Sequence, residues 1–349
     1  MEKLLTDFVV FGKGCDWFNA LFKDIDNDDH FLIGRDQFCP CWQTRTSNFL
    51  CRIAWGEKFG RVNNSNFLSK CLIRKMCKNI NRKYPQGAIL IFHRSNPLSQ
   101  NEFFLNSLKK TNPKCKLVYW FTDVVKVVEY NIKDVIRISK QYYDLVITYE
   151  KEDAKEYGFE YVETPYSYFD KLPKIKKDRD IDLLYVGKSK LDIDSSRFAK
   201  IIKVFEIAKE KQLKVDFTIV DVPDECQKYK NDILYNKVIP YDELVKKVTR
   251  SKCILEVSQL DEKGTTLRLF EAIAFDTHLL FTNKNLLCHP YFDKKYMHYI
   301  DCSNLDNLTI DFGFLSENNV KYSKSLKNEI SPYSFLNRIY NLFIQKENC

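Results

Sequence analysis

The chain has 349 residues, 44% hydrophobic and 29% charged, as expected for a globular protein of about two domains. Ten glycines and ten prolines exclude collagen-like and low-complexity chains. The net charge of +8 comes from 55 basic and 47 acidic residues, which are interspersed and form no dense basic stripe of the nucleic-acid-binding kind. We therefore expect no nucleic-acid partner and only a mild attraction to anionic surfaces.

The cysteines and the apolar segments bear on the cellular compartment. The first residues do not form a signal-peptide pattern, and no stretch reaches the roughly 18 apolar residues of a membrane span. We therefore expect a cytoplasmic protein whose twelve cysteines are reduced. Their spacing does not follow the paired CxxC pattern of a structural zinc site, so we expect no bound metal.

Short apolar runs separated by helical patterns predict a first α/β domain over residues 1–165. The expected strands are 8–11, 88–92, 116–121 and 143–148, with helices over 102–110 and 125–141. Continuous apolar runs of this kind are typical of strands that are buried on both faces of a parallel sheet. Residues 37–66 show no clear period, and we interpret them as loops over one edge of this domain.

A second α/β domain is predicted over residues 181–330, after a linker at 166–180. Its expected strands are 181–187, 215–220, 238–239, 253–257 and 279–282, with helices over 196–212, 241–249 and 267–275. Residues 331–349 are expected to form a terminal amphipathic helix and a tail. Because open α/β sheets bind ligands at the carboxyl ends of their strands, two such sheets predict a ligand in a cleft between them.

The segment around Gly264 carries the clearest chemical pattern, because a glycine turn there follows a buried strand and opens a helix. The start of a helix presents free backbone N–H groups and partial positive charge to an anion. Thr265 and Thr266 can cap the helix or offer hydroxyls to a phosphate, and Arg268 can reach the same anion. Glu271 lies on nearly the same helix face, where a carboxylate suits ribose hydroxyls. The alternative is a capped helix on which Arg268 and Glu271 form an exposed ion pair.

Three residues near expected strand ends of the first domain are candidates for acid–base chemistry, namely Asp16, His93 and Asp123. A carboxylate or an imidazole at such a place can take a proton from a substrate hydroxyl. The alternatives are a hydrogen-bonded structural histidine and two aspartates that cap helices or form turns. The glycine pair within 12–17 starts like a dinucleotide-binding fingerprint, but a tryptophan occupies the third glycine position, so we exclude that motif.

Four segments of the second domain, 185–187, 238–244, 251–255 and 259–272, resemble the donor domain of GT-B glycosyltransferases. More narrowly, they are similar to bacterial enzymes of capsular polysaccharide or lipopolysaccharide synthesis. Residues 143–159 are similar to the last strand and helix of the acceptor domain in that family. The resemblance implies an α/β fold with two Rossmann-like doubly wound domains facing a cleft, followed by a C-terminal helix.

The resemblance also implies a nucleotide-sugar site in the second domain. The residues that it places at the diphosphate are Gly187, Lys188, Gly264, Thr265, Thr266 and Arg268. The backbone at Val238 and Ile239 would meet the nucleobase, and Glu271 would hold the ribose. Enzymes of this family generally need no metal, because cations and a helix dipole stabilise the departing diphosphate. Lys188 and Arg268 are our candidates for these cations.

Two positions depart from the family pattern. Many related retaining enzymes have a glutamate eight residues before the one that binds ribose, and this chain has Lys263 there, next to Glu262. Asp276 replaces a glycine that is usual before the next strand. The first departure leaves open whether the sugar configuration is retained or inverted, and the second alters the expected turn.

From this pattern we expect a metal-independent, cofactor-free hexosyltransferase that uses a nucleoside-diphosphate sugar, with UDP as the expected nucleotide. The expected acceptor is a lipid-linked or other oligosaccharide of bacterial surface polysaccharide synthesis, at the inner face of the plasma membrane. The side chains that could form a membrane or acceptor surface are Trp42, Phe49, Arg52, Trp55, Phe59 and Arg61. The alternatives are a nucleotide-sugar epimerase and a non-catalytic nucleotide-sugar-binding protein.

Overall fold

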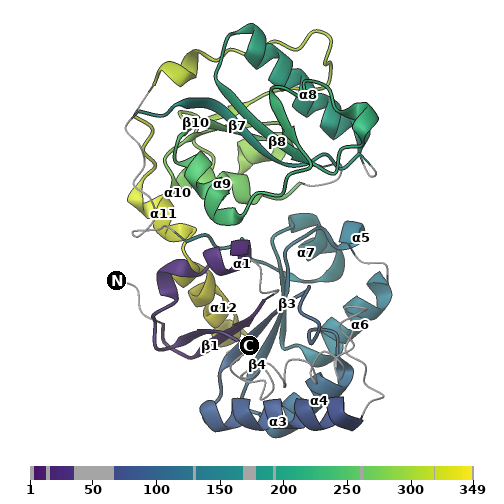
Figure 1. Ribbon diagram of the computed structural model, residues 1–349. Coiled ribbons are helices and arrows are strands. Elements are labelled where there is room, and N and C mark those ends of the chain that lie inside the picture. The colour runs from purple at the N-terminus through teal and green to yellow at the C-terminus, as the bar shows by residue number, and fades with distance from the viewer. Residues whose placement is uncertain are drawn as a thin grey trace. The chain divides into compact units, whose positions relative to one another are not determined.

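The computed structural model describes residues 4–12, 16–34, 67–128, 131–167, 178–191, 194–259, 263–317 and 319–347. The chain forms two compact units (Figure 1). Unit 1 contains residues 1–165 together with 332–349, and unit 2 contains residues 166–331. The aromatic and basic side chains expected to form a membrane or acceptor surface within 37–66 lie outside the described residues.

Unit 1 contains a parallel sheet of six strands in the order β2-β1-β3-β4-β5-β6. The strands are β1 (Phe8–Phe11), β2 (Phe31–Ile33), β3 (Ile89–His93), β4 (Lys116–Phe121), β5 (Leu145–Thr148) and β6 (Glu160–Tyr161). Every residue of β1 and β3 is buried, which explains the continuous apolar runs in the sequence.

Helices complete unit 1, and α3 packs against α4 (Figure 1). They are α1 (Asp16–Ala20), α3 (Phe67–Lys83), α4 (Glu102–Thr111), α5 (Val125–Val128), α6 (Ile132–Tyr142), α7 (Lys151–Tyr157) and α12 (Pro332–Glu347), with a 3₁₀ turn η1 (Lys23–Ile25). The last helix therefore belongs to the unit that the chain left at residue 165.

Unit 2 contains a second parallel sheet of six strands in the order β12-β11-β10-β7-β8-β9. The strands are β7 (Ile181–Lys188), β8 (Val215–Val220), β9 (Ile233–Tyr235), β10 (Ser251–Glu256), β11 (His278–Phe281) and β12 (Met297–Tyr299). The chain builds outward from β7 in one direction and then returns to build from β10 in the other. The switch point of this doubly wound sheet lies between β7 and β10, where such sheets bind ligands.

The helices of unit 2 are α8 (Ser195–Glu210), α9 (Tyr241–Val248), α10 (Leu267–Ala274) and α11 (Lys324–Glu329), with 3₁₀ turns η3 (Asp224–Cys226), η4 (Lys284–Cys288) and η5 (Gly313–Ser316). The two predicted α/β sheets are confirmed. The strand expected at 238–239 is wrong, because β9 lies at 233–235 and Asn236 then turns the chain with φ 55°. Across the described part of the chain, no helix is both long and apolar enough to cross a bilayer.

Candidate functional site

The turn that leads into α10 is hydrogen-bonded to the loop after β11, at the carboxyl edge of the unit 2 sheet. The side-chain amide of Asn283, which follows β11, donates to the backbone oxygens of Lys263 (3.3 Å) and Gly264 (3.0 Å). Thr266 is the N-cap of α10, and its hydroxyl accepts from the Arg268 N–H at 3.2 Å. Thr265 is buried beside it. The helix start predicted from the sequence is therefore in place and held on both sides.

The guanidinium of Arg268 lies at the switch point of the sheet. Its Nη2 donates to the backbone oxygen of Val186 on β7 at 2.7 Å, directly before Gly187. Its Nη1 donates to a carboxylate oxygen of Glu271. Burial is the largest single effect and disfavours the cation, but the charge and the hydrogen bond of Glu271, with smaller contributions from Tyr241 and Tyr185, together raise the pKa of Arg268 above its ordinary value. Arg268 is thus a fixed positive charge beside the end of β7, with 20% of its side chain exposed.

Glu271 is completely buried, and both of its carboxylate oxygens have donors. Arg268 binds Oε2, and the hydroxyl of Tyr241 donates to Oε1 at 3.0 Å. The hydroxyl of Tyr166 lies 2.7 Å from that of Tyr241. Burial raises the pKa of both tyrosines well above 10, so both phenols stay protonated. Sequence reasoning missed both tyrosines, although Tyr241 lies inside a segment that carries the family resemblance.

The remaining residues predicted at the diphosphate lie at the end of β7. Lys188 is the last residue of β7 and forms an ion pair with Asp221 at 2.8 Å, with more than half of each side chain exposed. Gly187 precedes it, and a Cβ at that position would lie 2.8 Å from the hydroxyl oxygen of Tyr185. A side chain at this position would therefore press on the hydroxyl of Tyr185, and the bare glycine backbone leaves room for close approach at the end of β7.

Val238 and Ile239, the residues predicted at the nucleobase, lie in the loop before α9. Val238 is 81% exposed, and Ile239 is half-buried. Tyr241 begins α9 two residues after Ile239 and contacts Glu271, so this loop is anchored beside α10. Val238 is therefore an exposed apolar side chain in the loop before α9.

In unit 1, His93 is buried at the carboxyl end of β3. Its Nδ1 accepts from the Ser95 N–H at 3.2 Å and lies 2.6 Å from the Ser95 hydroxyl, and its Nε2 lies 2.6 Å from the Thr122 hydroxyl. Since Nδ1 is an acceptor, this network assigns the proton to Nε2. The ring makes edge contacts with Phe18 and Trp120. In this arrangement neither nitrogen faces an open space, which fits the structural alternative for His93.

The other two acid–base candidates of unit 1 differ in exposure. Asp123 follows β4, has a side chain that is 53% exposed, and receives a 3.4 Å contact from Nε of Arg94. Asp16 is the first residue of α1, and its side chain is not among those described. The structure therefore brings His93, Arg94 and Asp123 to one edge of the sheet, as the strand ends predicted.

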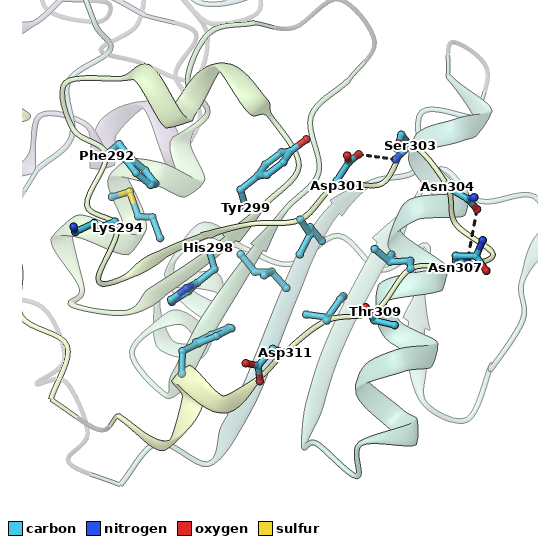
Figure 2. Close-up of a pocket in the computed structure, with 16 residues that line it drawn as sticks. Phe292, Lys294, His298, Tyr299, Asp301, Ser303, Asn304, Asn307, Thr309 and Asp311 are labelled. Carbon is cyan, nitrogen blue, oxygen red and sulfur yellow. Dashed lines mark hydrogen bonds between the residues drawn. The ribbon is translucent and has the colours of Figure 1, made fainter.

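A separate hollow of about 690 Å³ lies on the outer strand β12 of unit 2. Figure 2 shows polar side chains such as Asp301, Asn304 and Asn307 around it. None of the nine residues predicted to bind the donor lines this pocket. Among the described residues, no three His, Cys, Asp or Glu side chains gather as a metal ion would require.

No family model matches the sequence, and no curated protein matches it. Among solved structures, a trehalose-6-phosphate synthase studied for glycosyl transfer with retention is 9% identical, with TM-score 0.52 and coverage of 97% of this chain and 98% of that one. The sucrose-phosphate synthase of Thermosynechococcus elongatus is 8% identical, with TM-score 0.50 and coverage of 98% and 99%. A chain of the Gap123 glycosylation-associated complex of Streptococcus agalactiae is 9% identical, with TM-score 0.43. The match covers 80% of this chain and 59% of that one, so this chain spans less than two thirds of its length. The likeness to the two synthases confirms the GT-B fold.

Proposed function

We propose that the protein is a glycosyltransferase that moves a sugar from a nucleoside-diphosphate donor to a saccharide acceptor. The observation that carries this proposal is Arg268, a fixed cation at the switch point of the unit 2 sheet, beside Gly187. The GT-B fold and the capped start of α10 support it, because both are suited to a diphosphate. UDP is the nucleotide that we propose, on the resemblance of the sequence motifs.

The proposed chemistry needs positive charge where the leaving diphosphate develops negative charge. Arg268 and Lys188 would supply that charge, and the N–H groups at the start of α10 would add to it. Preorganised charges of this kind act without a metal ion, and we propose a metal-independent reaction. Thr265 and Gly264 would shape the seat for the phosphates.

On the acceptor side, we propose Asp123 as the first candidate base of unit 1. Its carboxylate is exposed and held by Arg94, whereas the nitrogens of His93 are engaged. Asp123→Asn should lower the turnover rate roughly 100-fold with donor affinity unchanged, because general base catalysis is lost. A variant with wild-type turnover would remove Asp123 from this role.

The proposed acceptor is a lipid-linked or other oligosaccharide of bacterial surface polysaccharide synthesis, and the charge of α3 supports contact with an anionic membrane face. This helix carries six basic residues and no acidic residue. Its exposed cations include Arg74, Lys75, Lys78 and Arg82, while Phe67 at its start is 75% exposed. Basic helices with apolar side chains at one end bind anionic lipid surfaces.

Co-sedimentation with phosphatidylglycerol vesicles tests this contact. Replacing Arg74, Lys75, Lys78 and Arg82 with alanine should reduce binding by up to roughly a thousandfold, since each surface cation contributes about 1 kcal/mol. The matched control replaces four exposed lysines of unit 2, Lys209, Lys211, Lys228 and Lys230, and should bind as the wild type does. Equal loss in both variants would indicate a general effect of charge and would contradict a role of α3.

Calorimetric titration with UDP, GDP and ADP, followed by donor turnover, tests the main proposal. Donor consumed only with an acceptor supports transfer, donor interconverted alone indicates an epimerase, and binding without turnover indicates a non-catalytic binding protein. Arg268→Ala should weaken UDP binding by about 1–3 kcal/mol, because a charged hydrogen-bond donor to phosphate is lost. Arg250→Ala is the control, since Arg250 pairs with Asp180 on the surface of the same unit.

A further inference from the structure

A line of buried hydrogen bonds runs behind the cation at the switch point, and we call it the relay. It consists of Tyr166, Tyr241, Glu271 and Arg268, in that order. Tyr166 and Glu271 have no exposed surface, and Tyr241 is 9% exposed. The Arg268 side chain is 20% exposed, and its guanidinium also donates to the backbone oxygen of Val186.

The direction of the protons in the relay follows from its chemistry. The carboxylate of Glu271 only accepts, so the hydroxyl proton of Tyr241 points to Oε1. The oxygen of Tyr241 is then free to accept, and Tyr166 is the donor across 2.7 Å. Each hydrogen bond in the relay strengthens the next one, because hydrogen bonds in a line polarise one another.

Burial of Glu271 argues against direct contact with a ligand in this conformation. Both of its oxygens have partners inside the protein, and a ribose hydroxyl would have to displace Tyr241 or Arg268. A buried carboxylate is destabilising unless it is paired with a cation, and Arg268 provides that cation for Glu271. The guanidinium of Arg268 has five N–H donors, and its contacts to Glu271 and Val186 use one each.

We propose that Glu271 is a positioning residue that orients Arg268 toward the diphosphate, with Tyr241 and Tyr166 holding its second oxygen. This inference rests on the proposed function and departs from the ribose contact that the sequence resemblance implies. Glu271 binds the guanidinium through Nη1 and Val186 binds it through Nη2, so each contact uses one N–H and other N–H groups are left for a phosphate. In this role the relay affects the diphosphate through Arg268, and Glu271 is separated from the ligand by two hydrogen bonds.

The two roles of Glu271 predict opposite results for ligands with and without phosphate. Affinities are measured by calorimetry for UDP, uridine and inorganic pyrophosphate, in the wild type and in Glu271→Gln and Tyr241→Phe. In the positioning role, both variants weaken UDP and pyrophosphate roughly tenfold and leave uridine within about twofold, since only the diphosphate contact changes. In the ribose role, Glu271→Gln weakens uridine and UDP alike and leaves pyrophosphate unchanged, which would overturn the proposal.

A matched control separates this effect from general loss of packing. Tyr322 is buried in the same unit and donates its hydroxyl to the Thr277 oxygen at 3.3 Å, outside the relay. Tyr322→Phe removes the same atom and should bind all three ligands as the wild type does. If Tyr322→Phe loses pyrophosphate affinity as Tyr241→Phe does, the relay has no specific role.

The wild-type result distinguishes failure of the inference from failure of the proposed function. If the wild type binds pyrophosphate but neither UDP nor uridine, the nucleotide function fails, and the pyrophosphate affinities of the variants still decide the role of Glu271. If the wild type binds none of the three, Arg268 is no diphosphate ligand and both proposals are overturned. Where Glu271→Gln does not fold, Tyr166→Phe replaces it, with a smaller loss of pyrophosphate affinity expected in the positioning role.

Discussion

At the scale of single residues, Gly12 illustrates how packing can impose a residue that also looks like part of a motif. A Cβ on Gly12 would lie 2.1 Å from Cε1 of Phe18, and Phe18 has no exposed surface. The Gly12 oxygen accepts from the side-chain amide of Asn96 at 3.0 Å, which ties the end of β1 to the loop after β3. The glycine therefore serves the contact between Phe18 and the sheet, and no dinucleotide fingerprint is needed to explain it.

Gly12→Ala should lower the free energy of unfolding of unit 1 by about 1–3 kcal/mol, because the extra methyl forces Phe18 out of its packed position. Urea denaturation followed by tryptophan fluorescence measures the effect. Gly158→Asn is the control, since Gly158 has φ 69°, a Cβ there would meet nothing within 4 Å, and asparagine tolerates that backbone. Equal losses in the two variants would contradict the steric explanation.

The sequence located the residues of the relay only in part. Arg268 and Glu271 could be paired from their spacing of three on a helix, and the structure confirms the pair. The alternative of an exposed pair is wrong for Glu271, which has no exposed surface. Tyr166 and Tyr241 could not be found in this way, because Tyr241 meets Glu271 across 30 residues of sequence and Tyr166 meets Tyr241 across 75, and no local pattern encodes such contacts.

At the scale of elements, strands β11 and β12 are joined by a pair of histidines. Nε2 of His298 lies 3.1 Å from Nδ1 of His278, and the ring of His298 stacks on Phe314 with a centroid distance of 3.8 Å. His278 has no exposed surface. Burial lowers the pKa of both rings, to about 4 for His298, with the charge of His278 adding to the shift. Both rings are therefore neutral in the folded protein at neutral pH.

This pair predicts how the stability of unit 2 depends on pH. Between pH 6.5 and pH 4, His298 is protonated in the unfolded chain but stays neutral in the folded protein. Its contribution to the stability of unit 2 is therefore fully present above pH 6.5 and is lost as the pH falls toward 4. With allowance for partial exposure of His298, the loss is roughly 1–3 kcal/mol. Calorimetry of His298→Phe should show a flatter decline for the unit 2 transition than the wild type. His30→Gln, in unit 1, should keep the wild-type slope, and an unchanged slope in His298→Phe would contradict the assignment.

The strands that the sequence did not predict are the short outer ones. β2, β6 and β12 have three, two and three residues, too few for a period to emerge. β12 has the sequence Met-His-Tyr, and it becomes a strand by pairing with β11. Val238 and Ile239 resemble a strand because they are apolar and β-branched, yet Val238 is 81% exposed, since the chain has already turned at Asn236. Sheet edges depend on partners that are remote in sequence.

At the scale of the whole molecule, the chain does not build its two units strictly one after the other. It leaves unit 1 at residue 165, completes unit 2, and returns with α12. Phe335 packs against Trp120 and Phe22, with ring centroids 5.0 and 6.2 Å apart. Tyr333 donates to Asp28 at 3.1 Å. The sequence predicted an amphipathic terminal helix but not its location, because an apolar stripe of this kind fits either sheet equally well.

Because α12 packs on unit 1, we predict that removing the C-terminal segment destabilises unit 1 and not unit 2, which directly precedes α12 in the sequence. Leu336 and Ile339 have no exposed surface, and Phe335 and Phe343 are also buried. Removing these four side chains forfeits about 1.5–3 kcal/mol each, which is comparable to the whole stability of a typical domain. A chain ending at Ser331 should therefore contain an unfolded unit 1 and a unit 2 that keeps its cooperative thermal transition.

Tryptophan fluorescence separates the two units, because all four tryptophans of the chain lie within residues 1–165. In the truncated chain, their emission should move to the wavelength of the urea-unfolded protein, while calorimetry still shows the unit 2 transition. Leu336→Ala should weaken unit 1 by about 2–5 kcal/mol, and Ile344→Ala should change it little, because Ile344 on the same helix is 40% exposed. Native tryptophan emission after truncation would contradict a role of α12 in stabilising unit 1. Loss of the unit 2 transition alone would indicate that α12 stabilises unit 2 instead.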